Sequence, residues 1–167
     1  AVQMAHDQSK KEGTGQFSAK SKMQSLKKLA QNGKTEAMNE LGLMLLNIRE
    51  YQEAIDWFKK AIEIKPDDPV YNANLAYAYH KNGDLVSART HYEKAAQKGL
   101  TLSHVSLGWL SIEEYKFQEA VEWFEKAVAK DGKTEYVKNL ACAHELNGDY
   151  IQAIALYKKV AQQENDD

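Results

Sequence analysis

Residues 75–96 read LAYAYHKNGDLVSARTHYEKAA, and this stretch decides the fold. Small and apolar residues recur at helical spacing on both sides of Asn82-Gly83-Asp84, which indicates two amphipathic helices joined by a tight turn. A glycine in that turn can take the left-handed backbone conformation that ends one helix, and an aspartate can cap the next helix. The stretch therefore predicts an antiparallel helix hairpin.

The same pattern occurs four times along the chain. In the quoted copy, Leu75-Ala76 is followed at fixed distances by Ala88, Tyr92 and Ala95. The other three copies keep these spacings with Leu41, Gly42, Ala54, Phe58 and Ala61, with Leu107, Gly108, Ala120, Phe124 and Ala127, and with Leu140, Ala141, Ala153, Tyr157 and Val160. The alanine thirteen residues after each leucine recurs at 54, 88, 120 and 153, in steps of 34, 32 and 33 residues. A period of this length predicts an array of stacked helical repeats.

The recurring residue types have a packing explanation. Gly42, Ala76, Gly108 and Ala141 fall where the two helices of a pair must approach closely, so a small residue is needed there. The recurring aromatic residue fills the space between helices, and its full burial contributes roughly 1.5–3 kcal/mol. Pro66 ends the first copy because proline cannot continue a helix.

This pattern resembles the tetratricopeptide-repeat (TPR) family over about residues 20–163. The matching features are the Leu-Gly/Ala pair, the Ala-x-x-x-aromatic step, the later alanine and, in the first copy only, Pro66. Residues 29–33 (LAQNG) and 95–99 (AAQKG) are similar to the related SEL-like repeat.

The resemblance implies an all-α fold, a right-handed α-solenoid of stacked antiparallel helix pairs with a concave and a convex side. We expect a basic arm over residues 1–16 and a repeat domain over 17–167, with repeats at about 35–68, 69–100, 101–133 and 134–167. A leading helix is expected at 20–31. The helix pairs are expected at 35–47 and 51–64, 70–81 and 85–97, 101–112 and 117–129, and 134–146 and 150–163.

Composition excludes several classes of protein. The 167 residues are 43% hydrophobic, enough for a core, and the formal charge of −2 is unlike the basic surface of a nucleic-acid binder. Residues 1–34 carry a net charge of +5, and we interpret the first sixteen of them as a solvated arm rather than a binding site. No apolar run is long enough for a membrane span. No basic-then-apolar leader is evident, so we expect no retained signal peptide, and the compartment stays open.

The sequence offers no catalytic or metal chemistry. Cys142 is the only cysteine, and none of the five histidines lies four residues from another, as a helical zinc pair would require. His104 and His144 are expected to face the inside of their hairpins, and Trp57 and Trp123 to pack between helices. We predict a protein that is not an enzyme and that has no cofactor.

The resemblance also implies a partner-binding groove on the concave side, lined by the first helix of each pair. Carried over position by position, its residues are Asn39, Leu43, Leu46, Asn47, Ala73, Asn74, Tyr77, His80, Lys81, Val105, Trp109, Ile112, Glu113, Lys138, Cys142 and Glu145. Large aromatic side chains in a concave surface are typical of binding hot spots. The alternative is that the arc curls enough for these side chains to bury one another.

Some TPR proteins grip the C-terminal carboxylate of cytosolic chaperones with a set of Lys, Arg and Asn residues. The matching positions here are Asn39, Leu43, Asn74, Leu102 and Ser106. Only Asn74 keeps the required type and no cation is present, so we expect no such binding.

The last expected helix, 150–163, is apolar on more than one flank. Residues 164–167 are too few for a further helix. We therefore expect the flank with Ile151 and Ile154 to be covered by a second molecule in a two-fold contact, or by further chain.

Three functions stay open from sequence. The first is a non-enzymatic scaffold that binds a peptide or helix of a partner protein in the groove. The second is a self-assembling structural adaptor, such as a homodimer, that contacts copies of itself or the rest of a longer chain. The third is a nucleic-acid accessory that uses the basic arm, although the net charge of −2 on the whole chain makes nucleic-acid binding unexpected. Membrane insertion is not expected.

Overall fold

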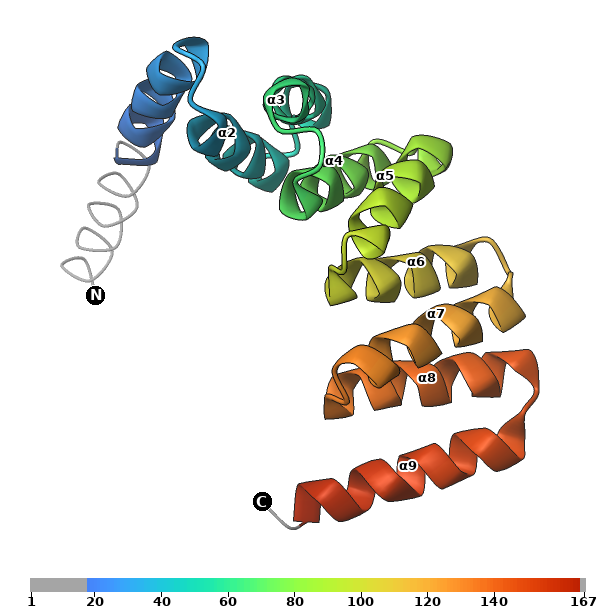
Figure 1. Ribbon diagram of the computed structural model, residues 1–167. Helices are drawn as coiled ribbons and strands as arrows, with labels where there is room; N and C mark the ends of the chain where they lie inside the picture. The colour runs from blue at the N-terminus through green and yellow to red at the C-terminus, as the bar shows by residue number, and fades with distance from the viewer. Residues whose placement is uncertain (1–17, 166–167) are drawn as a thin grey trace, which may run out of the picture. The chain divides into compact units, whose positions relative to one another are not determined.

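The computed structural model describes residues 18–165 (Figure 1), so the expected arm at 1–16 lies outside the described residues. The chain divides into two compact units, the first ending at Pro66 and the second beginning at Asp67. Unit 1 contains a helix over residues 18–31, α2 (Thr35–Asn47) and α3 (Tyr51–Ile64). Unit 2 contains α4 (Pro69–Lys81), α5 (Leu85–Gln97), α6 (Thr101–Glu113), α7 (Phe117–Lys130), α8 (Thr134–Asn147) and α9 (Tyr150–Asn165).

The helices follow the repeat pattern closely. Three of the predicted ranges, 35–47, 51–64 and 85–97, are observed without change, and the other ends differ by one or two residues. No strand occurs between residues 18 and 165. In both units consecutive helices pair antiparallel, which confirms the predicted all-α class.

Close approach within a pair depends on the glycine of the Leu-Gly step. A Cβ atom added to Gly42 would lie 2.6 Å from the ring of Phe58, and one added to Gly108 would lie 2.6 Å from the ring of Phe124. Both rings are fully buried. Glycine is therefore required at these two positions because the aromatic ring occupies the space of a side chain.

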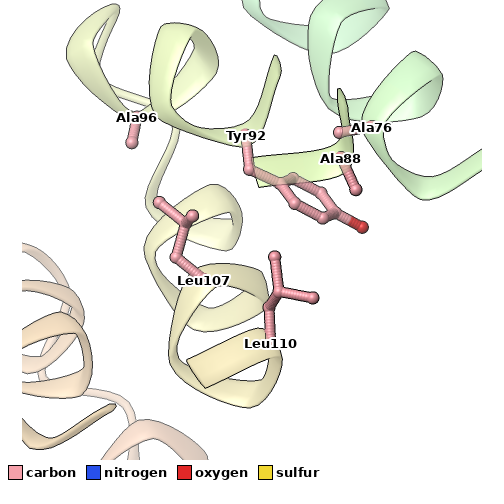
Figure 2. Close-up of a cluster of buried hydrophobic side chains, with 6 residues drawn as sticks. All are labelled: Ala76, Ala88, Tyr92, Ala96, Leu107 and Leu110. Carbon is pink, nitrogen blue, oxygen red and sulfur yellow. The ribbon is translucent and has the colours of Figure 1, made fainter. Parts of the chain in front are cut away.

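The core of unit 2 runs from helix to helix without a break. One cluster joins α4, α5 and α6 through Ala76, Ala88, Tyr92, Ala96, Leu107 and Leu110 (Figure 2). Figure 2 shows the Tyr92 ring reaching from α5 between the two alanines and Leu110. A second cluster joins α7 to α8 through Ala120, Val121, Phe124, Leu140 and Ala143. The helices from α4 to α8 thus bury apolar residues against their neighbours in the stack.

The turns inside the helix pairs share one backbone geometry. Gly83 and Gly148 have φ of +88° and +87°, and Asp84 caps α5 by accepting a 3.0 Å hydrogen bond from the Ser87 amide. The equivalent turns of the first and third pairs hold Arg49 and Tyr115, with φ of +66° and +59°. Two non-glycine residues are therefore held in the left-handed region.

Candidate protein-interaction surface

Tyr77 and Trp109 occupy equivalent positions on α4 and α6, the first helices of two neighbouring pairs in unit 2. The Tyr77 side chain is 45% exposed, and the Trp109 side chain is 41% exposed. Seven residues earlier, on the same helix face, Val70 and Leu102 are also exposed. We call Val70, Tyr77, Leu102 and Trp109 the aromatic face.

Packing beneath the surface fixes the two aromatic rings. Trp109 stands edge-on against the buried ring of Phe124, with the ring centroids 5.5 Å apart. The Nζ atom of Lys81 lies 5.3 Å from the centroid of the Tyr77 ring. The Trp109 ring is therefore held on one side by a buried ring and open to solvent on the other, so it has less side-chain freedom to lose on binding.

Polar contacts connect the helices beside this face. The Nε2 atom of His80 on α4 lies 2.8 Å from a carboxylate oxygen of Glu113 on α6. The Tyr157 hydroxyl of α9 donates to a carboxylate oxygen of Glu145 on α8 over 3.1 Å. These contacts tie α4 to α6 and α8 to α9, and they leave the Glu113 side chain half exposed.

The hydroxyl of Tyr92 lies below the aromatic face. Burial raises the pKa of Tyr92 to about 12, a hydrogen bond with Ser106 opposes the shift, and Tyr77 and Glu113 add to it. The groups that act on this hydroxyl therefore come from both α4 and α6. Tyr92 is a neutral support for the face at any physiological pH.

The Cys142 thiol is not an activated nucleophile. Burial raises its pKa, and the charge of Glu145 raises it further. A reactive thiol needs the opposite environment, because the thiolate is the attacking species. Within residues 18–163, no group of three or more His, Cys, Asp and Glu side chains is arranged to hold a metal ion.

The predicted groove residues differ in how much surface they offer. The exposed ones are Leu43, Asn47, Tyr77, Lys81, Trp109, Glu113, Lys138 and Glu145, and the half-buried ones are Asn39, Ala73, Asn74, His80, Val105, Ile112 and Cys142. Leu46 is buried, at 8% exposure, and offers almost no surface to a partner. Val105 and Ile112 pack against the α7–α8 cluster, so much of their apolar area is used inside the fold.

Sequence analysis missed the apolar extension of this face. The sequence pattern gives no prediction for Val70, and it places Leu102 only at a position that lacks a cation. The signal was present, because both residues lie seven positions before an aromatic residue and therefore on the same helix face.

The outward flank of α9 is exposed as expected. Ile151 is 83% exposed and Ile154 is 53% exposed. The residue equivalent to Ile154 on α7 is Val121, which is 3% exposed within the cluster that α7 forms with α8. The difference arises because no described helix follows α9.

Family profiles match two overlapping parts of the chain. A profile described as "TPR repeat" matches residues 42–83, and one described as "Tetratricopeptide repeat" matches residues 70–97. A curated relative, the small glutamine-rich tetratricopeptide repeat-containing protein 2 of Mycosarcoma maydis, is 31% identical over 107 residues. The match covers 63% of this chain but only 30% of that protein, so the chain spans less than a third of the relative's length.

Solved structures share the fold. MamA aligns with a TM-score of 0.78 at 19% identity over 86% of this chain and 87% of that chain. A MamA fragment from Desulfovibrio magneticus RS-1 gives 0.76 at 22% identity over 92% and 89%. BtubC from P. vanneervenii gives 0.71 at 15% identity over 79% and 63%. These similarities confirm the predicted α-solenoid of helix pairs. Between residues 18 and 165, no helix is both long and apolar enough to cross a membrane.

Proposed function

We propose that this tetratricopeptide-repeat protein, a non-enzymatic protein-interaction scaffold, holds an extended or helical segment of a partner protein on its aromatic face. The observation that carries the proposal is the exposure of Tyr77 and Trp109 at equivalent positions of neighbouring first helices. Large aromatic side chains dominate the binding energy of protein interfaces, and these two are open to solvent.

The polar residues around the face describe the partner further. Glu113 and Glu145 are exposed on α6 and α8, and Lys81 and Lys138 are exposed on α4 and α8. Both signs of charge are present, so no single charge selects the partner. We expect a segment with two apolar anchors and a mixed polar flank. Unit 1 has a surface of its own at the corresponding positions of α2, with Leu43 and Asn47 exposed and Asn39 half buried.

Site-specific photo-crosslinking tests this proposal. A photoreactive phenylalanine analogue replaces Tyr77, Trp109 or, as a control, Val86, which is 79% exposed on α5. We expect positions 77 and 109 to cross-link the same partner in cells and position 86 not to. Tyr77→Ala combined with Trp109→Ala should abolish capture and leave the melting temperature nearly unchanged.

Two outcomes contradict the proposal. One is a partner that cross-links only at position 86. The other is a double variant that loses several kcal/mol of stability, because the two aromatic residues would then be core rather than binding surface.

A second contact, between copies of the chain, is proposed for the flank of α9. Two α9 helices brought together about a two-fold axis would give Ile154 the cover that α8 gives Val121. The position comparison between α7 and α9 supports this, since the same site is buried in one helix and open in the other.

Light scattering after size exclusion tests the second contact. At high concentration we expect a dimer for the parent chain and a monomer for Ile151→Lys and Ile154→Lys. Val86→Lys is the control, because Val86 lies on α5 and is 79% exposed, close to the 83% of Ile151; this variant should stay dimeric. A monomeric parent chain contradicts the proposal.

A further inference from the structure

Unit 1 contains a cavity of about 370 Å³ beside Trp57. It lies where residues 30–33, α2 and α3 meet, and its main walls are Gly33, Met38, Trp57, Lys60, Glu63 and Ile64. We call it the Trp57 notch. Its lining combines apolar side chains with one amide group, from Gln31, one carboxylate and one ammonium group.

The chain contains a second copy of this arrangement, 66 residues later in unit 2. The Gly33 amide donates to the Ala30 carbonyl over 3.0 Å, and the Gly99 amide donates to the Ala96 carbonyl over 2.9 Å. Both glycines have a positive φ, +82° and +94°. The turn that forms one wall is therefore built in the same way in both copies.

The tryptophan of each copy is also held in the same way. The indole N–H of Trp57 donates to Glu53 over 3.5 Å, and that of Trp123 donates to Glu119 over 3.4 Å. An ammonium group covers each ring, from Lys60 at 4.2 Å and from Lys126 at 4.0 Å. The two copies differ at the wall residue Met38, whose equivalent in unit 2 is His104, 5.9 Å from the Trp123 ring between ring centroids.

In unit 2, Lys130 reaches the turn at Gly99, and we call this the filled copy. Its Nζ atom donates to the carbonyl oxygen of Gly99 over 2.8 Å and lies 3.2 Å from the place where a Cβ of Gly99 would be. The equivalent residue in unit 1 is Ile64, which has no group to donate and is 53% exposed. Next to it stands Glu63, where unit 2 has Ala129. Compared with its copy in unit 2, the Trp57 notch therefore lacks the ammonium group of Lys130 and has the additional carboxylate of Glu63.

We propose that the Trp57 notch binds a lysine side chain of a partner protein. The ammonium group takes the place of the Lys130 ammonium, donates to the Gly33 carbonyl oxygen and lies close to the Glu63 carboxylate. The methylene groups of the lysine lie against Met38 and Ile64, since long cationic side chains bury their stems on apolar surface. Arginine fits less well, because the filled copy accommodates a compact ammonium on a narrow stem.

The charge of Lys60 does not prevent this binding. In unit 2 two ammonium groups already share the same space, because Lys126 covers the tryptophan while Lys130 bonds to Gly99. The notch adds Glu63, which makes its potential more favourable for a cation than that of the filled copy. This site is separate from the aromatic face and does not depend on it.

Indole N–H signals in nuclear magnetic resonance spectra of the full chain test the proposal. The chain has three tryptophans, and Trp109→Phe and Trp123→Phe assign their signals. The probe is Nα-acetyl-lysine N-methylamide, which keeps the side-chain ammonium group. We expect it to cause a saturable shift of the Trp57 signal with a Kd of about 10 mM or tighter. The Trp109 and Trp123 signals should not move. The norleucine analogue, which lacks the ammonium group, should bind at least about tenfold more weakly.

Variants at positions 63 and 64 make the test specific. Ile64→Lys supplies the internal ammonium group that unit 2 has in Lys130, so we expect it to close the notch and abolish the shift. Ile64→Met, of similar length but without charge, should retain binding within about threefold. Glu63→Gln should weaken binding about tenfold. Circular dichroism confirms that each variant is folded, as expected for changes at an exposed position.

Four results would overturn the proposal. They are an unmoved Trp57 signal, equal shifts with the lysine and norleucine probes, unchanged binding by Ile64→Lys, and a Trp57 signal that moves when the protein alone is concentrated. The last result would make a second copy of the chain, not a partner, the donor of the lysine.

Discussion

At the scale of single residues, the packing of paired helices depends on two missing Cβ atoms. Gly108→Ala would place a carbon 2.6 Å from the buried ring of Phe124, so the ring or the helix must move. We expect a loss of about 1–3 kcal/mol of stability, the range for overpacked cores. Gly132→Ala is the matched control, because its nearest neighbour would be the Val128 carbonyl oxygen at 3.8 Å. Urea denaturation of both variants measures the difference, and equal midpoints would contradict this account.

The left-handed turn residues lead to the opposite prediction. Arg49 and Tyr115 occupy positions where the other two pairs have glycine, with φ of +66° and +59°. Left-handed backbone costs an ordinary residue about 1–2 kcal/mol, part of which the greater chain entropy of glycine offsets. We expect Arg49→Gly and Tyr115→Gly each to stabilise the chain by about 0.5–1 kcal/mol. Thermal melting tests this, with Gly83→Ala expected to lower the melting temperature. A decrease in both glycine variants would show that the side chains stabilise the fold more than the turn strains it.

At the scale of helices, Arg89 of α5 links its pair to the next. Its guanidinium lies 2.7 Å from Glu114 and 2.6 Å from Glu119, with all three side chains at least half buried. A hydrogen bond from Lys116 lowers the pKa of Glu114, burial opposes the shift, and Arg89 lowers it further. A carboxyl with a lowered folded-state pKa stabilises the fold above its unfolded pKa of about 4.3, and this contribution is lost as the pH falls through the folded value.

Acid denaturation of variants measures this link. We expect Arg89→Met to cost about 1–3 kcal/mol at pH 7, because it removes the guanidinium that Glu114 and Glu119 share. Both Arg89→Met and Glu114→Gln should lose less stability than the parent chain between pH 5 and pH 3. Glu125→Gln, a change at an exposed residue of α7, is the control. An unchanged slope of stability with pH in both variants would refute the role of this cluster.

The helices could be predicted from sequence because the repeat spacing determines them. Ala54, Ala88, Ala120 and Ala153 keep one spacing to the aromatic residue and the turn, so each copy supports the assignment of the others. Exposure could not be predicted in the same way. Leu46 and Tyr77 were both expected in the groove, yet one is 8% and the other 45% exposed. That difference depends on how tightly neighbouring helices pack, which a single-helix periodicity does not contain.

The finer site features depend on pairs of residues far apart in sequence. His80 and Glu113 are 33 residues apart, and Lys130 reaches a carbonyl 31 residues before it. A periodic pattern shows which positions are equivalent, but not which side chains meet. The contrast between Ile64 and Lys130 was visible in the sequence once the repeats were aligned, although its meaning required the bond to Gly99.

At the scale of the whole molecule, the residues on the first helix of each pair predict one class of partner that does not bind. The positions that grip a chaperone C-terminal carboxylate in some TPR proteins hold Asn39, Leu43, Asn74, Leu102 and Ser106 here, without a cation. We expect a peptide with an acidic, free C-terminus to bind no better than millimolar, about −4 kcal/mol. Calorimetry with the free and the amidated peptide tests this. A micromolar affinity that amidation removes would contradict the prediction.

The division of the chain at Pro66 and Asp67 predicts how the molecule unfolds. Repeat arrays need about three repeats for stability, because a single pair cannot bury both of its apolar faces. Unit 2 contains three helix pairs, α4 to α9, with core clusters that draw on these helices, whereas unit 1 contains one pair and the helix over residues 18–31. We therefore expect a fragment of residues 67–167 to keep its helicity and a cooperative urea transition, and a fragment of residues 1–66 to be largely unfolded or to melt without cooperativity. Circular dichroism of the two fragments and of the full chain measures both. If residues 67–167 lose their cooperative transition while the full chain keeps it, stability comes from the array as a whole, and the two units are not independent folding units.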